Sequence, residues 1–291
     1  MNIDTLLPWA GKQITATEEV TAIAARRIEA LLDRPRSDWT PGTRLPSHWY
    51  VTLFGETVRQ SELGIDGHPG KGDFLPPVPL PRRMFAGRRV RFEHPLHIGD
   101  TLFKTSTVKS ITPKSGKSGE MCFVTVCHEI FGAQGRAIHE EQDIVYRAQS
   151  APGSAPVANS PKANATLPET DNRDDCIANR HLVTPDEVML FRYSAITFNG
   201  HRIHYDRDYA RNVEGYPDLV VNGGLTLLLM WEHAIAQGVA LRYSASRNLK
   251  PLFVRQPIAL ECQERAGARS IRAFNPEGNL AVEANLTEAQ Q

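Results

Sequence analysis

One predicted helix is apolar on nearly all its sides, and this limits what the chain can fold into. The helix is expected over residues 225–237. Its large apolar side chains are Leu225, Leu228, Leu229, Met230 and Trp231. Since hardly any face of such a helix suits water, it is typically buried. The rest of the fold must therefore wrap around it.

Short alternating stretches follow this helix and are typical of antiparallel strands. They cover residues 241–246, 257–264, 270–274 and 280–286. The sequence Asn275-Pro276-Glu277-Gly278 favours a tight turn between the last two. A curved antiparallel sheet around one buried helix is a hotdog fold, and the second half is predicted to have it. A short helix is also expected before it, near residues 206–213.

The first half follows the same plan with a weaker helix signal. Thr15 and Glu18 are spaced for a capping box, and apolar residues then recur at helical spacing, so a helix is expected over residues 17–33. Alternating stretches at residues 90–92, 102–111, 121–131 and 137–146 predict an antiparallel meander. The predicted fold class is therefore α+β, with two hotdog domains forming a double hotdog.

A stretch rich in Ser, Pro and Ala, residues 148–164, separates the two halves. It has too few large apolar side chains to build a core, which is typical of a linker. We expect an N-terminal hotdog domain at residues 1–148, a linker at 149–175 and a C-terminal hotdog domain at 176–291. A chain of 291 residues is long enough for two such domains.

Composition argues against several classes of protein. Lys plus Arg and Asp plus Glu each total 33, so neither nucleic acid nor a membrane surface is an expected partner. The longest apolar run, residues 225–231, is far shorter than the roughly 20 residues that span a bilayer. No signal-peptide pattern opens the sequence, and the four cysteines show no zinc-site spacing. We expect a cytoplasmic protein with reduced thiols and no metal, acting on a small molecule.

Residues 198–204 carry an unusual density of polar side chains behind an apolar lead-in. Asn199, His201, Arg202 and His204 bring an amide, two imidazoles and a guanidinium together. Imidazole titrates near neutral pH and can both take and return a proton. The segment is therefore a candidate for positioning a water molecule or moving a proton. The alternative is that the histidines are buried polar residues that bond to loop carbonyls.

Paired glycines precede the apolar helix, as Asn222 is followed by Gly223 and Gly224. Glycine permits close backbone approach, and the first N–H groups of a helix have no helical partner. Together with the helix dipole, such groups suit an oxygen that gains negative charge. Gly223 is the candidate oxyanion donor. The alternative is that the glycines only form a tight turn against the sheet.

A proline-rich segment, residues 74–81, ends in Arg82 and Arg83. Its composition favours a stiff, polyproline-like conformation. The planar guanidinium of arginine suits a carboxylate or a phosphate, so either residue could hold the far end of a charged acyl group or coenzyme A. The alternative is a rigid surface loop with solvated arginines.

The motifs of this chain resemble those of the MaoC-like double-hotdog hydratases and dehydratases. The similarity covers residues 64–69, the proline-rich segment to Arg83, residues 140–147 and residues 197–225, and so spans almost the whole chain. It is most similar to the branch that contains the mesaconyl-CoA and itaconyl-CoA hydratases and the mitochondrial-type 3-hydroxyacyl-thioester dehydratase. The sequence Phe-Asn-Gly-His-Arg-Ile-His-Tyr-Asp is highly specific to this branch.

The resemblance implies a water site with two departures from the family pattern. The broader family carries Asp-x-Asn-Pro-Leu/Ile-His, in which Asp and His hold and activate the water, and here Asn199 takes the Asp position. An amide cannot accept a proton, so His204 is the expected base, with help from His201, while Asn199 orients the water. Asn222 is the second departure, because the family usually has His before the oxyanion glycine, here Gly223.

The implied activity is a hydro-lyase that reversibly adds water to the α,β double bond of an enoyl-CoA. A short branched dicarboxylic acyl-CoA such as itaconyl-CoA or mesaconyl-CoA is the expected substrate, with Arg82, Arg83, Arg202 and Asn222 as substrate-binding candidates. Coenzyme A belongs to the substrate, and no separate cofactor is implied. A 3-hydroxyacyl-thioester dehydratase acting on CoA or acyl-carrier-protein thioesters is the main alternative.

Two other functions stay open at this point, an acyl-CoA thioesterase and a non-catalytic acyl-CoA-binding protein. The first half contains no second Asn-x-His-x-x-His cluster. We therefore expect one active site per chain, with the first half helping to cover the acyl pocket. The halves are expected to pair as a pseudo-dimer, and association of chains into a homo-oligomer is left open.

Overall fold

The computed structural model of the chain describes residues 2–116, 119–148, 180–265 and 268–288. Contacts divide it into two compact units, of which one comprises residues 1–149 and Ala195–Gly200, and the other residues 150–194 and 201–291. The predicted linker at residues 149–175 lies outside the described residues, as does Cys176. The predicted domain limits therefore stay predictions.

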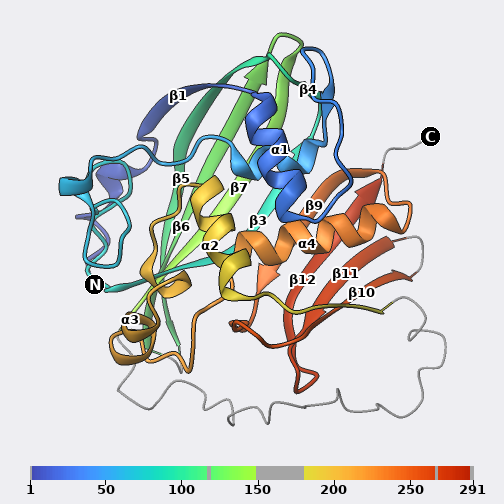
Figure 1. Cartoon of the computed structure of the whole chain (residues 1–291). Coiled ribbons are helices and arrows are strands. Elements are labelled where there is room, and N and C mark those ends of the chain that lie inside the picture. The colour runs from blue at the N-terminus through green and yellow to red at the C-terminus, as the bar shows by residue number, and fades with distance from the viewer. Residues whose placement is uncertain (1, 117–118, 149–179, 266–267, 289–291) are drawn as a thin grey trace. The chain divides into compact units, whose positions relative to one another are not determined.

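An antiparallel sheet forms the base of the first unit, with its strands in the order β1-β5-β6-β7-β3 (Figure 1). The strands are β1 (Gln13–Glu19), β3 (Arg82–Phe92), β5 (Thr101–Gly116), β6 (Gly119–Gly132) and β7 (Gly135–Arg147). A small pair, β2 (Arg44–Leu45) and β4 (Leu96–His97), accompanies it. The meander predicted from the alternating stretches is confirmed for β5, β6 and β7, whereas β3 pairs with β7 rather than with β5. Its buried face includes Val108, Val124 and Val126.

The first helix, α1 (Ala22–Leu31), begins later than the sequence pattern predicts. Thr15 and Glu18, the predicted capping box, lie in β1 instead. Thr21 is the N-cap residue, and its side-chain oxygen accepts a hydrogen bond from the N–H of Ala24 at 3.1 Å. The capping prediction was wrong because strand pairing with β5 satisfies the backbone of residues 13–19, which overrides a local helix signal.

Between α1 and β3 the chain forms short turns and the proline-rich segment. Short 3-10 helices in this unit are η1 (Leu7–Trp9), η2 (Ser47–Thr52) and η3 (Gln60–Glu62). Leu75, Val78 and Leu80 of the proline-rich segment are buried in a core cluster on the sheet. The segment is therefore packed rather than a solvated surface loop, and Arg82 and Arg83 begin β3.

The second unit confirms the wrapped helix. Helix α4 (Gly223–Ala236) contacts β9, β10 and β11, and Figure 1 shows it lying along the strands. Leu225, Leu228 and Trp231 are 0% exposed, and the indole N–H of Trp231 donates to the hydroxyl of Ser244 at 2.9 Å. The strands run in the order β9 (Leu241–Asn248), β12 (Leu280–Glu288), β11 (Ala268–Phe274), β10 (Ile258–Arg265) and β8 (Arg180–Val183).

Shorter elements complete the second unit. They are α2 (Glu187–Ile196), whose last two residues belong to the first unit, the 3-10 turn η5 (Arg202–His204) and α3 (Arg207–Asn212). The turn before β12 forms as predicted, since the N–H of Gly278 bonds to the carbonyl of Asn275 at 2.9 Å and Gly278 has a φ of 74°. None of the helices in the described part of the chain is long and apolar enough to cross a membrane.

Candidate active site

Residues 197–204 connect α2 to α3 along a sharply turning path. Phe198 has a φ of 51°, which is a left-handed conformation that side chains larger than glycine rarely adopt. His201 then precedes the turn Arg202–His204, and Asp206 caps α3 by accepting the N–H of Tyr209 at 3.0 Å. A strained phenylalanine indicates that packing around the segment, rather than local preference, fixes its path.

Close backbone contacts hold the part of this segment that belongs to the first unit. A Cβ placed on Gly55 would lie 2.8 Å from the Cβ of Phe198, and one placed on Gly200 would lie 2.7 Å from the carbonyl oxygen of Gly67. No side chain fits at either position. Gly55 and Gly200 therefore allow residues 197–200 to pack closely against the rest of the first unit. The two close contacts lie on either side of Asn199 in sequence.

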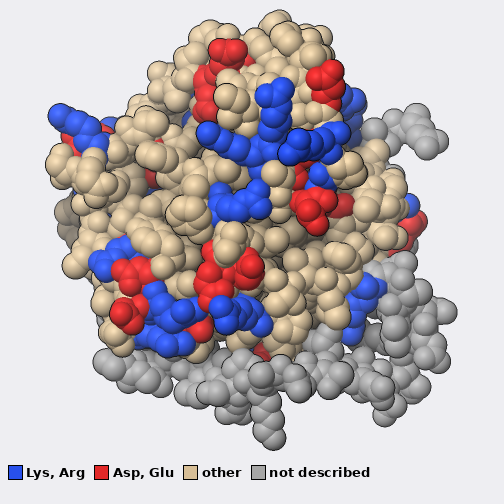
Figure 2. All heavy atoms as spheres, in the orientation of Figure 1, with Lys and Arg blue, Asp and Glu red and all other residues tan. Residues whose placement is uncertain are grey.

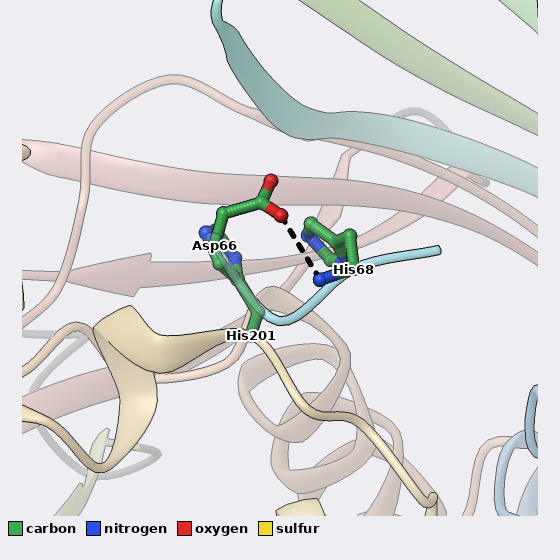
Figure 3. Close-up of side chains that lie close together, drawn as sticks. All are labelled: Asp66, His68 and His201. Carbon is green, nitrogen blue, oxygen red and sulfur yellow. Dashed lines mark hydrogen bonds between the residues drawn. The ribbon is translucent and has the colours of Figure 1, made fainter. Parts of the chain in front are cut away.

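Gly67 lies in a compact loop, residues 63–70. The N–H of Gly64 bonds to the carbonyl of His68 at 2.7 Å, and Gly67 has a φ of 84°. The backbone N–H of His68 donates to Oδ1 of Asp66 at 3.0 Å, which is the dashed line in Figure 3. The loop thus holds the carboxylate of Asp66 against the backbone of His68.

Sequence reasoning assigned no role to Asp66 and His68, although it included their segment in the family resemblance. Both are half-buried, and they flank the glycine whose carbonyl meets Gly200. The signal in the sequence was that two polar residues, Asp66 and His68, flank a glycine. The contact with a residue so distant in sequence was not readable, because it is made by backbone atoms alone.

His201 and His204 lie together in the second unit. They are 8% and 7% exposed, and their ring centroids are 5.4 Å apart with the ring planes nearly perpendicular. The sequence prediction that these two residues act together is compatible with this geometry. Buried imidazoles in contact can pass a proton between them only if one nitrogen of each is free.

His204 has a defined tautomer. Its Nδ1 lies 2.7 Å from the carbonyl oxygen of Val220, and a carbonyl only accepts, so Nδ1 carries the proton and Nε2 keeps its lone pair. Burial lowers the pKa of His204 to about 4, against the opposing effect of the Val220 hydrogen bond. At neutral pH the ring is therefore uncharged and can accept a proton at Nε2.

The N-terminus of α4 presents uncapped N–H groups. Asn222 is the N-cap residue, yet its side chain makes no capping hydrogen bond, and its Nδ2 instead donates to the hydroxyl of Ser194 at 3.4 Å. The Oδ1 of Asn222 is buried and has no hydrogen-bond partner in the described part of the chain. Gly223 and Gly224 follow, and a Cβ on Gly224 would clash with the hydroxyl of Tyr193.

The predicted substrate-binding arginines differ in their surroundings. Arg202 bonds to Asp206 at 2.6 Å and stacks over the ring of Tyr209 at 4.2 Å, so its guanidinium is already engaged. Arg82 is buried, whereas Arg83 is half-buried and lies close enough to Lys71 to lower its pKa. Basic and acidic side chains both occur on the face shown in Figure 2, in keeping with totals of 33 each.

Two comparisons of sequence cover most of the chain. The profile of hydroxyacyl-thioester dehydratase type 2 matches residues 47–254. The mesaconyl-C(4)-CoA hydratase of Chloroflexus aurantiacus is 39% identical to the chain over 284 residues, which is 96% of each chain.

Solved structures show the same fold. A MaoC-like dehydratase from Phytophthora capsici matches with a TM-score of 0.62 at 15% identity and covers 100% of both chains. A double-hotdog protein from Mycobacterium tuberculosis matches with a TM-score of 0.58 at 15% identity and covers 95% of both chains. The predicted α+β double hotdog is therefore confirmed.

Proposed function

The chain belongs to the hydroxyacyl-thioester dehydratase type 2 family, and from this premise we propose that it reversibly adds water to the α,β double bond of a short branched dicarboxylic enoyl-CoA. It is a hydro-lyase, as the resemblance to the MaoC-like enzymes predicted. The proposal assigns the residues that carry the reaction and the acyl group on which they act.

The hydrogen bond and the burial of His204 are the observations that carry the proposal. Its Nδ1–H is fixed on the carbonyl of Val220, and its Nε2 is a neutral acceptor with a pKa of about 4. Such a nitrogen can remove a proton from water at neutral pH, which Asn199 cannot do because an amide oxygen is a very weak base. Asn199 then orients the water, and His201 supports proton transfer.

Gly223 serves as the oxyanion donor in this proposal. Its N–H is among the first of α4, where no helical acceptor is available and the side chain of Asn222 does not cap. A thioester oxygen that becomes negative during the reaction gains both a hydrogen bond and the favourable end of the helix dipole. The Oδ1 of Asn222, which has no partner among the described residues, is an acceptor for a polar group of the substrate.

The reaction balances without a metal or a redox cofactor. Water gives one proton to Nε2 of His204 while its oxygen bonds to the β-carbon. The double-bond electrons move onto the α-carbon and the thioester oxygen, where the N–H of Gly223 stabilises the enolate-like anion. The imidazolium of His204, directly or through His201, returns the proton to the α-carbon, which completes the addition of H and OH.

The similarity to a mesaconyl-C(4)-CoA hydratase along almost the full chain supports a dicarboxylic substrate such as mesaconyl-CoA or itaconyl-CoA. A free carboxylate on the acyl group needs a cation, and we assign this role to Arg82 or Arg83 at the start of β3. Arg202 is a weaker candidate, because Asp206 and Tyr209 already occupy its guanidinium.

A 3-hydroxyacyl-thioester dehydratase is the second candidate function, and the family profile favours it by its description. The same water site would serve in the reverse direction, since removal of water passes through the same enolate-like state. The two functions differ in the acyl chain rather than in the catalytic groups.

A substrate panel tests the proposal directly. Purified protein would be given mesaconyl-CoA, itaconyl-CoA and straight-chain trans-2-enoyl-CoA esters, with loss of the enoyl-thioester absorbance followed and free coenzyme A titrated by a thiol reagent. A kcat/KM at least about tenfold higher for the dicarboxylic esters is expected, which corresponds to roughly 1.4 kcal/mol from one charged contact. Preference for straight chains would favour the dehydratase; free coenzyme A, or binding without turnover, would refute a hydratase.

A further inference from the structure

We infer that Tyr193 is a further catalytic residue, and that its hydroxyl donates a second hydrogen bond to the thioester oxygen, beside the N–H of Gly223. The inference rests on the proposed function, because it adds a donor to the same oxyanion site. Both residues belong to the second unit, as do all the contacts that support the role. Sequence reasoning assigned no function to Tyr193.

Helix α2 brings Tyr193 to the first turn of α4. A Cβ placed on Gly224 would clash with the Tyr193 hydroxyl, and it would lie 3.4 Å from Cζ and 3.7 Å from Cε1 of the same ring. The next residue of α2, Ser194, accepts a hydrogen bond from Nδ2 of Asn222 at 3.4 Å. Two neighbouring side chains of α2 therefore contact the N-terminus of α4.

Space, rather than backbone conformation, explains the glycine at position 224. Gly224 lies in α4 and is not among the glycines with a positive φ, so other residues could adopt its conformation. Alanine would favour the helix more than glycine does. The helix forgoes this advantage at the one point where a side chain would collide with a hydroxyl. Gly224 thus makes room for the hydroxyl of Tyr193.

The hydroxyl lies toward the end of α4 that carries the unpaired N–H groups. Cα–Cβ bonds in an α-helix tilt toward the N-terminus, so an atom at the Cβ position of Gly224 is displaced in that direction. The first N–H groups of a helix have no helical acceptor, and the side chain of Asn222 does not cap them. Tyr193 therefore places a donor beside the N–H groups that are proposed to hold the thioester oxygen.

The same end of α4 is tied to the proposed base. The carbonyl of Val220 accepts the hydrogen bond from Nδ1 of His204 at 2.7 Å. The N–H of Val220 bonds to the carbonyl of Ile203 at 3.0 Å, which joins the chain before α4 to the segment that carries the base. His204, the glycine pair and Tyr193 are thus held together by contacts inside one unit.

The proposed reaction gives a second donor a defined use. Oxyanion sites combine backbone N–H groups with side chains such as tyrosine, whose hydroxyl is protonated at neutral pH and can donate. Tyr193 is only 4% exposed, so a hydrogen bond from it competes little with water. The thioester oxygen gains its charge only during the reaction. A donor at this point therefore raises kcat more than it tightens substrate binding.

The first test is Tyr193→Phe, which removes the hydroxyl and keeps the ring. On whichever enoyl-CoA the wild type turns over, we expect kcat to fall about 10²-fold and KM to change less than about threefold. Tyr216→Phe is the matched control, since Tyr216 is another buried tyrosine of this unit and packs on Phe253. Its kcat should stay within about twofold of wild type.

Unchanged kcat in Tyr193→Phe, beside an active wild type, would overturn the inference and leave the proposed function standing. If the wild type turned over none of the esters, the proposed function would fail, and the catalytic role of Tyr193 would fail with it. The two failures are therefore distinguished by the activity of the wild type.

A substitution at Gly224 tests the position of the hydroxyl without relying on turnover. In the wild-type background, Gly224→Ala must displace the Tyr193 hydroxyl and should lower the urea midpoint of unfolding. In the Tyr193→Phe background the new methyl group meets the ring at an ordinary contact distance, so the midpoint should be unchanged or raised. The double variant should have the kcat of Tyr193→Phe. The same midpoint shift in both backgrounds would overturn the inference.

Discussion

The buried polar network around Glu140 in the first unit is closed by its own partners, whereas polar groups at the proposed site of the second unit are not. Glu140 of β7 accepts a hydrogen bond from the hydroxyl of Tyr50 at 2.8 Å and pairs with Arg88 at 3.2 Å. His128, its cross-strand neighbour, uses both ring nitrogens in hydrogen bonds. In the second unit, His204 uses one nitrogen, and Oδ1 of Asn222 has no partner in the described part of the chain.

We propose that this difference separates the structural network around Glu140 from the proposed catalytic groups of the second unit. A buried donor or acceptor without a partner costs stability, so it persists when something other than folding requires it. A closed network instead specifies how strands and helices pack. We therefore expect substitutions in the network around Glu140 to lower the free energy of unfolding. Substitutions of His204 should mainly change the rate of the proposed reaction.

The largest expected effect is on catalysis at His204. His204→Ala removes the proposed base and should lower kcat for hydration about 10³-fold. His128→Ala is the control, because His128 is a half-buried imidazole that has no acceptor left for water. Its kcat per folded molecule should stay within about twofold of wild type. Full hydration activity in His204→Ala would refute the proposed mechanism.

The next effect is on stability at Glu140. Glu140→Gln leaves Arg88, whose side chain is 12% exposed, without its anion, which should lower the free energy of unfolding by about 3–5 kcal/mol in urea titrations. Glu283→Gln offers a control, since Glu283 pairs with the largely exposed Arg247 and should lose less than about 1 kcal/mol. If Glu140→Gln lowered kcat but not the free energy of unfolding, the network around Glu140 would be functional rather than structural.

The smallest effect is the pH dependence that His204 gives to folding. Its pKa in the folded chain is about 4, below the ordinary value of 6.5. The unfolded chain therefore binds the extra proton first as pH falls, and stability is lost between pH 6.5 and about 4 by roughly 3 kcal/mol. His204→Gln should remove this part of the pH dependence in unfolding titrations. If His204→Gln left the pH dependence of the unfolding free energy unchanged, the ring of His204 would not be uncharged and buried in the folded chain.

Periodicity in the sequence predicted most of the fold. Helix α4 and its strands were readable because a helix apolar on nearly all sides allows few surroundings. The start of α1 was not, since Thr15 and Glu18 fit a capping box but pair as a strand. That choice depends on β5, which lies far along the chain and carries no local signal.

The candidate site was only partly readable for a similar reason. His204 and Gly223 stand out by residue type and position, whereas the acceptor of Nδ1, the carbonyl of Val220, could not be inferred. The approach of Gly67 to Gly200 was missed because it is made by backbone atoms. Contacts of that kind leave only a glycine in the sequence, and glycine has many other uses.

The passage of Ala195–Gly200 through the first unit limits how the protein can be dissected. A fragment that begins after residue 175 would contain every proposed catalytic histidine, yet Phe198 and Gly200 would lack their contacts with Gly55 and Gly67. The left-handed turn at Phe198 would then have nothing to hold it. The two halves are therefore not interchangeable modules, because the segment that leads into the proposed histidines is packed by the first unit.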